Sequence, residues 1–238
     1  MITGNVQIDR HHLERFGNIV IDAQPSQQQA QLFKRWAAAA KSGGGKVIMQ
    51  LSHAGRQTPK LCNSRPSAPS PVAVALPGGQ FGQPREMTVD EIKDVISGMG
   101  RAAKVARDAG FDGVQVHGAH GYLISQFLSP RSNQRGDEWG GPLENRARLL
   151  LECVREVKVQ AGPGFSVSVK LNSADFQKGG FSHDECLAVI EGLNDLDLDF
   201  VEISGGNYSN QDDGYRWFGT SIRRAVRKAP VRASLFHQ

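Results

Sequence analysis

Two histidines and a tyrosine lie close together near the middle of the chain, at His117, His120 and Tyr122. Residues 111–117 alternate between apolar and other side chains and predict a β-strand. His117 is the last residue of this strand, and His120 and Tyr122 follow it. A neutral imidazole can donate a hydrogen bond to a carbonyl oxygen on which negative charge develops, and a tyrosine can pass a proton to an adjacent carbon. These residue types at the end of a strand therefore suit acid–base chemistry on a carbonyl compound.

Metal binding is the main alternative for His117 and His120, because histidine pairs are common metal ligands. A metal hydrolase would hold its ion there, but no regularly spaced Cys, Asp or Glu completes an evident zinc set. Residues distant in the sequence could still complete one. The three cysteines are far apart and odd in number, which indicates neither a disulfide framework nor an iron–sulfur cluster. We therefore expect no metal, and a reducing, cytoplasmic compartment.

Strands and helices alternate along the chain around this group. The predicted strands cover residues 46–52, 111–117, 165–171 and 200–204, and the predicted helices cover residues 26–41, 88–109, 142–160 and a segment that begins at 182. Residues 57–85 contain six of the eleven prolines and predict a long loop. Such alternation predicts parallel strands joined by crossover helices, either in a closed barrel or in an open doubly wound sheet.

The alternation of side chains within the strands favours the barrel. In residues 165–171 the apolar side chains face one way and the polar ones the other, and residues 111–117 and 200–204 divide in the same manner. Strands of an open doubly wound sheet are usually apolar on both faces. We therefore predict a TIM (β/α)8 barrel in which Gln50, His117, Lys170 and Ser204 converge at the C-terminal mouth, where barrel enzymes carry their active sites.

The composition is that of an ordinary globular α/β protein. The 238 residues are 39% hydrophobic and 22% charged, and no apolar run is long enough for a membrane helix. The net charge of +4 comes from basic residues scattered among acidic ones. One basic cluster, Arg223, Arg224, Arg227 and Lys228, has the spacing of a solvated helix face. We therefore expect neither a nucleic-acid nor a membrane partner, and no export signal at the N-terminus.

Three segments of the chain resemble the old yellow enzyme family, in the family's order and spacing. They are VIMQLSHAGR (47–56), FDGVQVHGAHGYLISQFLSPRSNQRGDEWGGPLENRARLLLE (111–152) and VSVKLNSADFQKGGF (167–181). The resemblance implies an eight-stranded (β/α) barrel with FMN across its C-terminal mouth. It also implies NADPH or NADH as the reductant and an activated alkene, an enone or enal, as the substrate.

The resemblance assigns roles to five residues. Gln50 matches the glutamine that binds the flavin pyrimidine edge, and Lys170 stands where the family commonly has an arginine beside flavin N1 and O2. His117 and His120 match the pair that binds the electron-withdrawing group of the substrate, and Tyr122 matches the proton donor. The alternatives are a buried strand glutamine for Gln50 and an interior salt bridge for Lys170.

The two ends of the chain depart from the family pattern. The segment ITGNVQID (2–9) matches one that follows the family's first strand and helix, and PVRASLFHQ (230–238) ends before the last strands, which bind the FMN phosphate. We expect a single partial barrel domain over residues 1–238, without strand 1 and without all or part of strands 7 and 8. Such a chain would bind FMN poorly and would self-associate through open strand edges. The alternative function is therefore an inactive, flavin-poor fragment or a partner-binding module.

Overall fold

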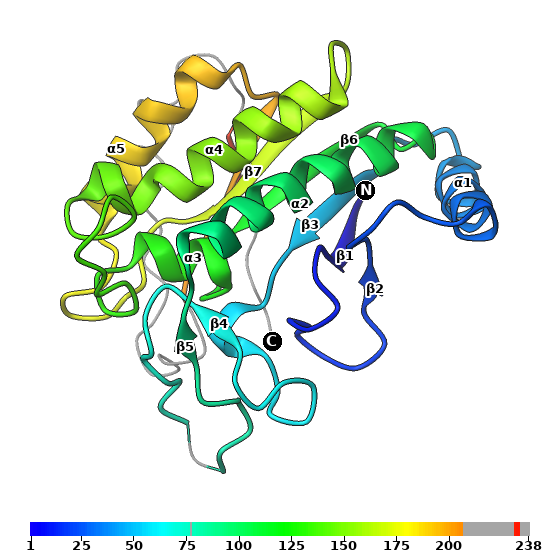
Figure 1. Ribbon diagram of the computed structural model, residues 1–238. Helices are drawn as coiled ribbons and strands as arrows, with labels where there is room; N and C mark the ends of the chain where they lie inside the picture. Colours follow the sequence, from blue (N-terminus) through cyan, green and yellow to red (C-terminus); the bar gives the residue numbers. More distant parts are fainter. Residues whose placement is uncertain (77, 207–230, 234–238) are drawn as a thin grey trace.

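One parallel sheet runs through the molecule (Figure 1). The structure, a computed structural model, describes residues 1–76, 78–206 and 231–233. The strands of this sheet lie in the order β2-β1-β3-β6-β7-β8-β9. They are β1 (Ile2–Gln7), β2 (Ile19–Val20), β3 (Ile48–Ser52), β6 (Gly113–Gly118), β7 (Ser166–Asn172), β8 (Phe200–Ser204) and β9 (Val231–Ala233). A separate pair of short strands, β4 (Ser67–Ala68) and β5 (Arg85–Glu86), lies within the long excursion after β3.

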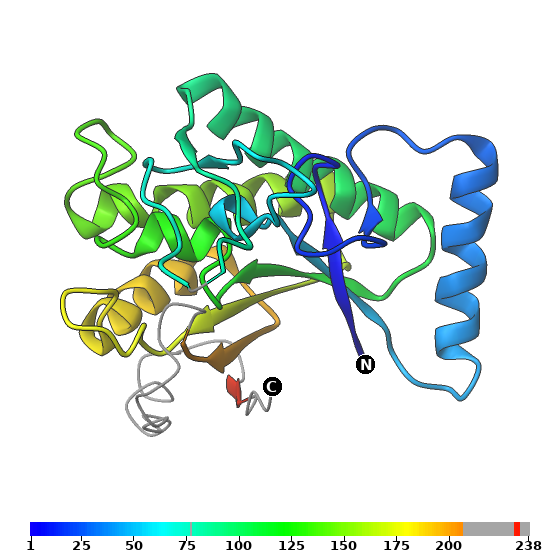
Figure 2. The same cartoon turned by 90° about the horizontal axis from the view of Figure 1, so that it is seen from below.

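Helices lie in the connections from β2 to β3, β3 to β6, β6 to β7 and β7 to β8. They are α1 (Gln27–Lys41), α2 (Val89–Asp108), α3 (Leu123–Leu128), α4 (Leu143–Ala161) and α5 (His183–Leu193), with short 3₁₀ turns η1 (Gly55–Gln57) and η2 (Asn194–Leu196). Figures 1 and 2 show that α2 and α4 lie side by side along one face of the sheet. None of the helices in the described ranges is long and apolar enough to cross a membrane.

Local capping residues set the helix boundaries. The hydroxyl of Thr88 accepts a hydrogen bond from the Glu91 N–H, and the Glu91 side chain accepts one from the Thr88 N–H. The same reciprocal pair opens α1 at Ser26 and α5 at Ser182. After α2 the chain turns at Gly110, whose φ of 86° suits glycine. The four predicted helices are therefore confirmed.

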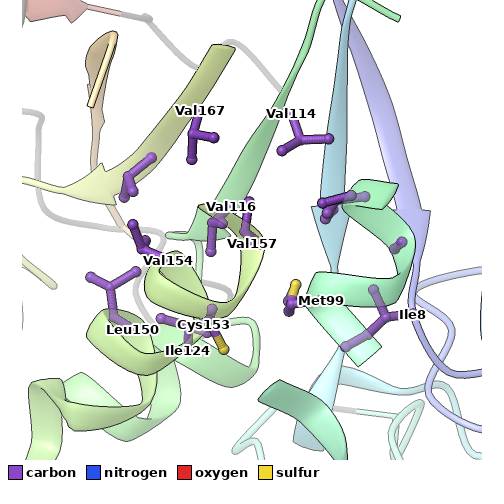
Figure 3. Close-up of a cluster of buried hydrophobic side chains, with 14 of the residues drawn as sticks. Ile8, Met99, Val114, Val116, Ile124, Leu150, Cys153, Val154, Val157 and Val167 are labelled. Atoms are coloured by element: carbon purple, nitrogen blue, oxygen red, sulfur yellow. The ribbon is translucent and has the colours of Figure 1, made fainter. Parts of the chain in front are cut away.

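The predicted division of each strand into an apolar and a polar face is also confirmed. Val114 and Val116 of β6 and Val167 of β7 point towards the helices, where they meet Val154 and Val157 of α4 (Figure 3). Burial of this apolar face supplies the main driving force for holding α2 and α4 on the sheet. The polar side chains of the same strands are left on the opposite face.

The sequence did not predict every element. Strand β1 was missed because its segment, ITGNVQ, contains few strongly apolar residues and a glycine. Helix α3 was missed because all six of its residues are buried, so it has no polar face to show helical periodicity. The basic cluster at residues 223–228 lies outside the described residues.

Candidate active site

Polar side chains gather at the carboxyl ends of the parallel strands. The strand register pairs Gln50 with Gln115, His117 with Lys170, and Lys170 with Glu202. All five residues are at most 8% exposed. Because parallel strands end at the same edge, neighbouring inward residues form one polar layer. The predicted convergence of Gln50, His117 and Lys170 is thus present.

A chain of hydrogen bonds joins the two predicted flavin ligands, Gln50 and Lys170. The Gln50 Nε2 donates to Gln115 Oε1 at 2.6 Å, and the Gln115 Nε2 donates to Glu202 Oε2 at 2.9 Å. The Lys170 Nζ lies 3.0 Å from Glu202 Oε1. Lys170 therefore does form an interior salt bridge. Glu202 thereby also holds the Lys170 ammonium in place among the strand ends.

The backbone at His120 has an uncommon conformation for a side chain of its size. Its φ is 60°, in the left-handed region, and the φ of Gly121 is also positive. The His120 N–H donates to Asn172 Oδ1 at 3.1 Å, its carbonyl accepts from Gln57 Nε2 at 3.1 Å, and its ring Nε2 lies 2.7 Å from Ser204 Oγ. Contacts from three other segments therefore maintain the turn and aim the His120 ring.

The ring of His117 contacts the rings of both His120 and Tyr122. The His117 ring centroid lies 5.1 Å from that of His120 and 5.0 Å from that of Tyr122, both edge to face. Burial lowers the pKa of His120 to about 3 and holds the pKa of His117 well below its usual value, with Lys170 adding to both shifts. Both imidazoles are therefore neutral at neutral pH.

The tautomer of His117 follows from its backbone contact. The Ala119 N–H donates to His117 Nδ1 at 3.2 Å, so the ring proton resides on Nε2. A neutral ring with Nε2–H can donate one hydrogen bond to a ligand without carrying charge. This is the property that the sequence indicated for acid–base chemistry on a carbonyl compound.

Glu14 is a site residue that sequence reasoning missed. The Tyr122 hydroxyl donates to Glu14 Oε2 at 3.0 Å, across 108 residues of sequence. Glu14 comes from the loop after β1 and also accepts a hydrogen bond from the Asn5 side chain. No motif in the sequence connects Glu14 with Tyr122.

Two more missed residues, Gln7 and Ser52, end neighbouring strands. They are paired in the register of β1 and β3, and both are fully buried. Both polar atoms of the Gln7 amide and the Ser52 hydroxyl have no hydrogen-bond partner among the described residues. Buried polar atoms are nearly always satisfied, so these are suited to a polar ligand or to water. The alternation in residues 2–7 was the one available signal.

A second titratable cluster, Asp9, His12 and His53, has ligand atoms within 4.8 Å of one another. The Ser67 N–H donates to His12 Nε2 at 2.8 Å, and the Gly55 N–H donates to His53 Nδ1 at 3.1 Å. The protons of both rings are therefore on the nitrogens that face Asp9, at 2.7 and 3.7 Å from its carboxylate. Since no lone pair faces the carboxylate, the contacts suit a hydrogen-bonded anchor for the loop after β1 and not a metal ion.

Comparison with known proteins gives a consistent picture. The model of the NADH:flavin oxidoreductase / NADH oxidase family matches residues 22–224. An NADH-dependent flavin oxidoreductase of Aspergillus parasiticus is 42% identical over 217 residues, which cover 90% of this chain and 49% of that protein. An NADPH dehydrogenase of Clostridium acetobutylicum is 40% identical over 185 residues, which cover 76% of this chain and 52% of that protein. The chain spans about half the length of these curated relatives.

Solved structures of the same kind share the fold. An old yellow enzyme homologue from Zymomonas mobilis matches with a TM-score of 0.83 at 27% identity, over 100% of this chain and 69% of that one. Morphinone reductase matches with a TM-score of 0.79 at 27% identity, over 98% of this chain and 66% of that one. The parallel sheet therefore covers part of a (β/α)8 barrel, as predicted. The chain belongs to the NADH:flavin oxidoreductase / NADH oxidase family, which includes the old yellow enzymes.

Proposed function

We propose that this chain forms the substrate-handling part of an FMN-dependent oxidoreductase that reduces activated C=C bonds with NADH or NADPH. The observation that carries the proposal is the contact of the His117 ring with the rings of His120 and Tyr122 at the end of β6, where both imidazoles are neutral. The relatives with NADH- and NADPH-dependent names support the choice of reductant. Enones and enals fit because their carbonyl oxygen accepts hydrogen bonds and their alkene must gain a proton and a hydride.

The chain's polar layer fits the edge of a flavin ring. The Gln50 amide and the Lys170 ammonium would face the carbonyl and N–H groups of the pyrimidine edge. The Gln7 amide and the Ser52 hydroxyl have no hydrogen-bond partner among the described residues, and they provide further donors and acceptors at the ends of β1 and β3. FMN, when bound, would supply the hydride that reaches the alkene β-carbon.

The remaining steps belong to side chains of this chain. The His117 Nε2–H would donate to the substrate carbonyl oxygen, and with His120 it would stabilise the negative charge that develops there. Tyr122 would pass its hydroxyl proton to the α-carbon, so the product gains one hydride and one proton. Ser204 and Asn172 would keep the His120 ring and backbone in place during this exchange.

Glu14 would act as a positioning residue in this reaction. Its carboxylate accepts the hydrogen bond of the Tyr122 hydroxyl at 3.0 Å, so it fixes where the proton donor lies. Glu14→Gln should slow alkene reduction and alter its pH profile, while reduction of the flavin stays unchanged. Glu138→Gln, at an exposed glutamate, is the matched control. A loss of flavin content with an unaltered pH profile would assign Glu14 a structural role only.

The Tyr122→Phe variant tests the proposed chemistry. In the FMN-loaded protein, stopped-flow absorbance would follow flavin reduction by NADH and NADPH, and then reoxidation by cyclohexenone without oxygen. Loss of a general acid slows its step by about 10²–10⁴-fold, so reoxidation should slow by that factor and flavin reduction should not change. An equal loss in both steps would contradict the role of Tyr122.

Two single histidine variants, one in the site and one outside it, test substrate binding separately. His117→Ala should raise the KM for cyclohexenone, whereas His11→Ala, at an exposed position, should leave it unchanged. Flavin fluorescence after gel filtration distinguishes the alternative function. Protein that takes up no FMN at micromolar cofactor would support the inactive fragment or partner-binding module in place of the reductase.

A further inference from the structure

A cavity of about 230 Å³ lies beside the segment that carries His120 and Tyr122. The loops that line it follow β3, β6 and β7, and its polar lining includes Arg56, Arg131 and Asp175. Gly121, the residue between His120 and Tyr122, forms part of the wall. At about 30 Å³ for each water molecule, the cavity has room for a tetrahedral oxyanion with its hydration. The proposed reaction assigns no role to Arg56, Arg131 or Asp175.

The two arginines bring more positive charge than the one acidic side chain of the lining, Asp175, can balance. Arg56 is only 9% exposed. Its Nη1 donates to the Val72 carbonyl at 3.0 Å, while its buried Nε has no partner among the described residues. Arg131 is exposed and donates to the Lys178 carbonyl at 2.9 Å. These two hydrogen bonds go to neutral carbonyl oxygens. No ion pair involves either guanidinium within the described part of the chain.

Asp175 is the acidic residue among the lining side chains. Its carboxyl accepts hydrogen bonds from the Phe181 N–H at 3.1 Å and from Asn172 Nδ2 at 3.4 Å, so it is occupied in holding its own loop. Burial raises the pKa of Asp175 and lowers the pKa of Arg56. The attraction between the two groups opposes both shifts, and Arg131 adds to the lowering of the Arg56 pKa. The cavity lining therefore holds one carboxyl group with a raised pKa and two guanidinium groups.

We propose that this cavity binds an oxyanion, a phosphate or carboxylate group, between Arg56 and Arg131. The free Nε of Arg56 is one arm of the planar guanidinium fork, which recognises two oxygen atoms of such a group. Asp175 can balance at most one of the two guanidinium charges, and a buried excess of positive charge is costly, so an oxyanion would lower that cost. Two molecules of the proposed reaction can carry the group: the nicotinamide nucleotide, through its phosphates, and an alkene substrate with an anionic tail.

Inorganic phosphate is the probe for the site, measured by isothermal titration calorimetry on the full chain. We expect one phosphate for each chain. Arg131→Gln should weaken phosphate binding at least tenfold; this position is exposed, where a substitution changes stability little. Arg155→Gln, at an exposed arginine paired with Glu152, should leave phosphate binding unchanged. Absence of phosphate binding, or equal affinity in the Arg131 variant, would overturn the proposal.

Displacement experiments identify the molecule that carries the oxyanion. If the source is the reductant, a non-reducing analogue of NADPH should displace phosphate; if it is the substrate, an enone with a carboxylate tail should do so and a neutral enone should not. Phosphate that neither displaces would support the oxyanion site and overturn its link to the reaction. This link rests on the proposed function, whereas phosphate binding itself needs neither FMN nor turnover, so the two can fail independently.

Discussion

Replacement of Lys170 by methionine should destabilise the chain strongly. The Lys170 Nζ lies 3.0 Å from Glu202 Oε1, and the two side chains are 9% and 10% exposed. Two unit charges at that separation attract each other by about 5.5 kcal/mol at an effective dielectric constant of about 20. The cost of removing both from water offsets much of this attraction. Removing one partner leaves the other charge buried and unpaired, which costs about 3–5 kcal/mol.

Urea unfolding, followed by circular dichroism, measures this loss. Lys104→Met is a matched control, because the Lys104 Nζ lies at a similar 2.8 Å from Asp108 while both side chains are about half exposed. An exposed i,i+4 pair contributes about 0.3–0.5 kcal/mol. The double change Lys170→Met with Glu202→Gln removes both buried charges, so it should recover at least about 2 kcal/mol of the single-variant loss.

The comparison of these variants decides whether the polar layer exists in solution. If Lys170→Met costs no more than Lys104→Met, the Lys170–Glu202 pair is not buried and the reasoning is wrong. If the double change is as unstable as Lys170→Met alone, the loss comes from packing of the lysine stem and not from charge. FMN affinity of the same proteins tests the cofactor role of Lys170, since the double variant restores stability without restoring the cation.

Acidification should destabilise the fold, because burial lowers the pKa of His53 to about 4 and of His120 to about 3, from 6.5. Below pH 6.5 the unfolded chain binds a proton at each of these histidines and the native state does not. The free energy of unfolding is therefore highest above pH 6.5 and falls by about 2 kcal/mol for each histidine at pH 5. A free energy of unfolding that stays constant from pH 7 to 5 would contradict this. Thr88→Ala removes the cap of α2 and should cost about 1 kcal/mol by urea unfolding, with an unchanged midpoint as the contrary result. In Gly113→Ala the new Cβ would lie 2.5 Å from a carbonyl oxygen of β7, so thermal unfolding should report a loss of about 1–3 kcal/mol in stability. Gly136→Ala is the control, because nothing lies within 4 Å of that Cβ position. Equal losses in the two variants would refute the close approach of β6 and β7.

The sequence by itself determined the alternation of the main strands and helices and the division of the strands into an apolar and a polar face. Helix α2 was predictable because Thr88 and Glu91 cap it through contacts only three residues apart. The barrel-type sheet was predictable because alternate residues of a strand point to opposite faces, so a two-residue pattern assigns each side chain to the helices or to the interior. For the same reason Gln50, His117 and Lys170 could be placed at one mouth before any coordinates were known.

Only the tertiary structure decided which polar groups meet inside that mouth. Glu14 contacts Tyr122 across 108 residues, and Lys170 pairs with Glu202 of the neighbouring strand. Strand alternation assigns a side chain to a face, but it does not say which partner on that face its polar atoms reach. Side-chain hydrogen bonds depend on positions to within a few tenths of an ångström, and those positions are set by the packing of the whole sheet against its helices. The tautomer of His117 and the Arg56 Nε that lacks a hydrogen-bond partner among the described residues follow from the same packing. The chemistry of the site therefore rests on contacts that no local sequence pattern encodes.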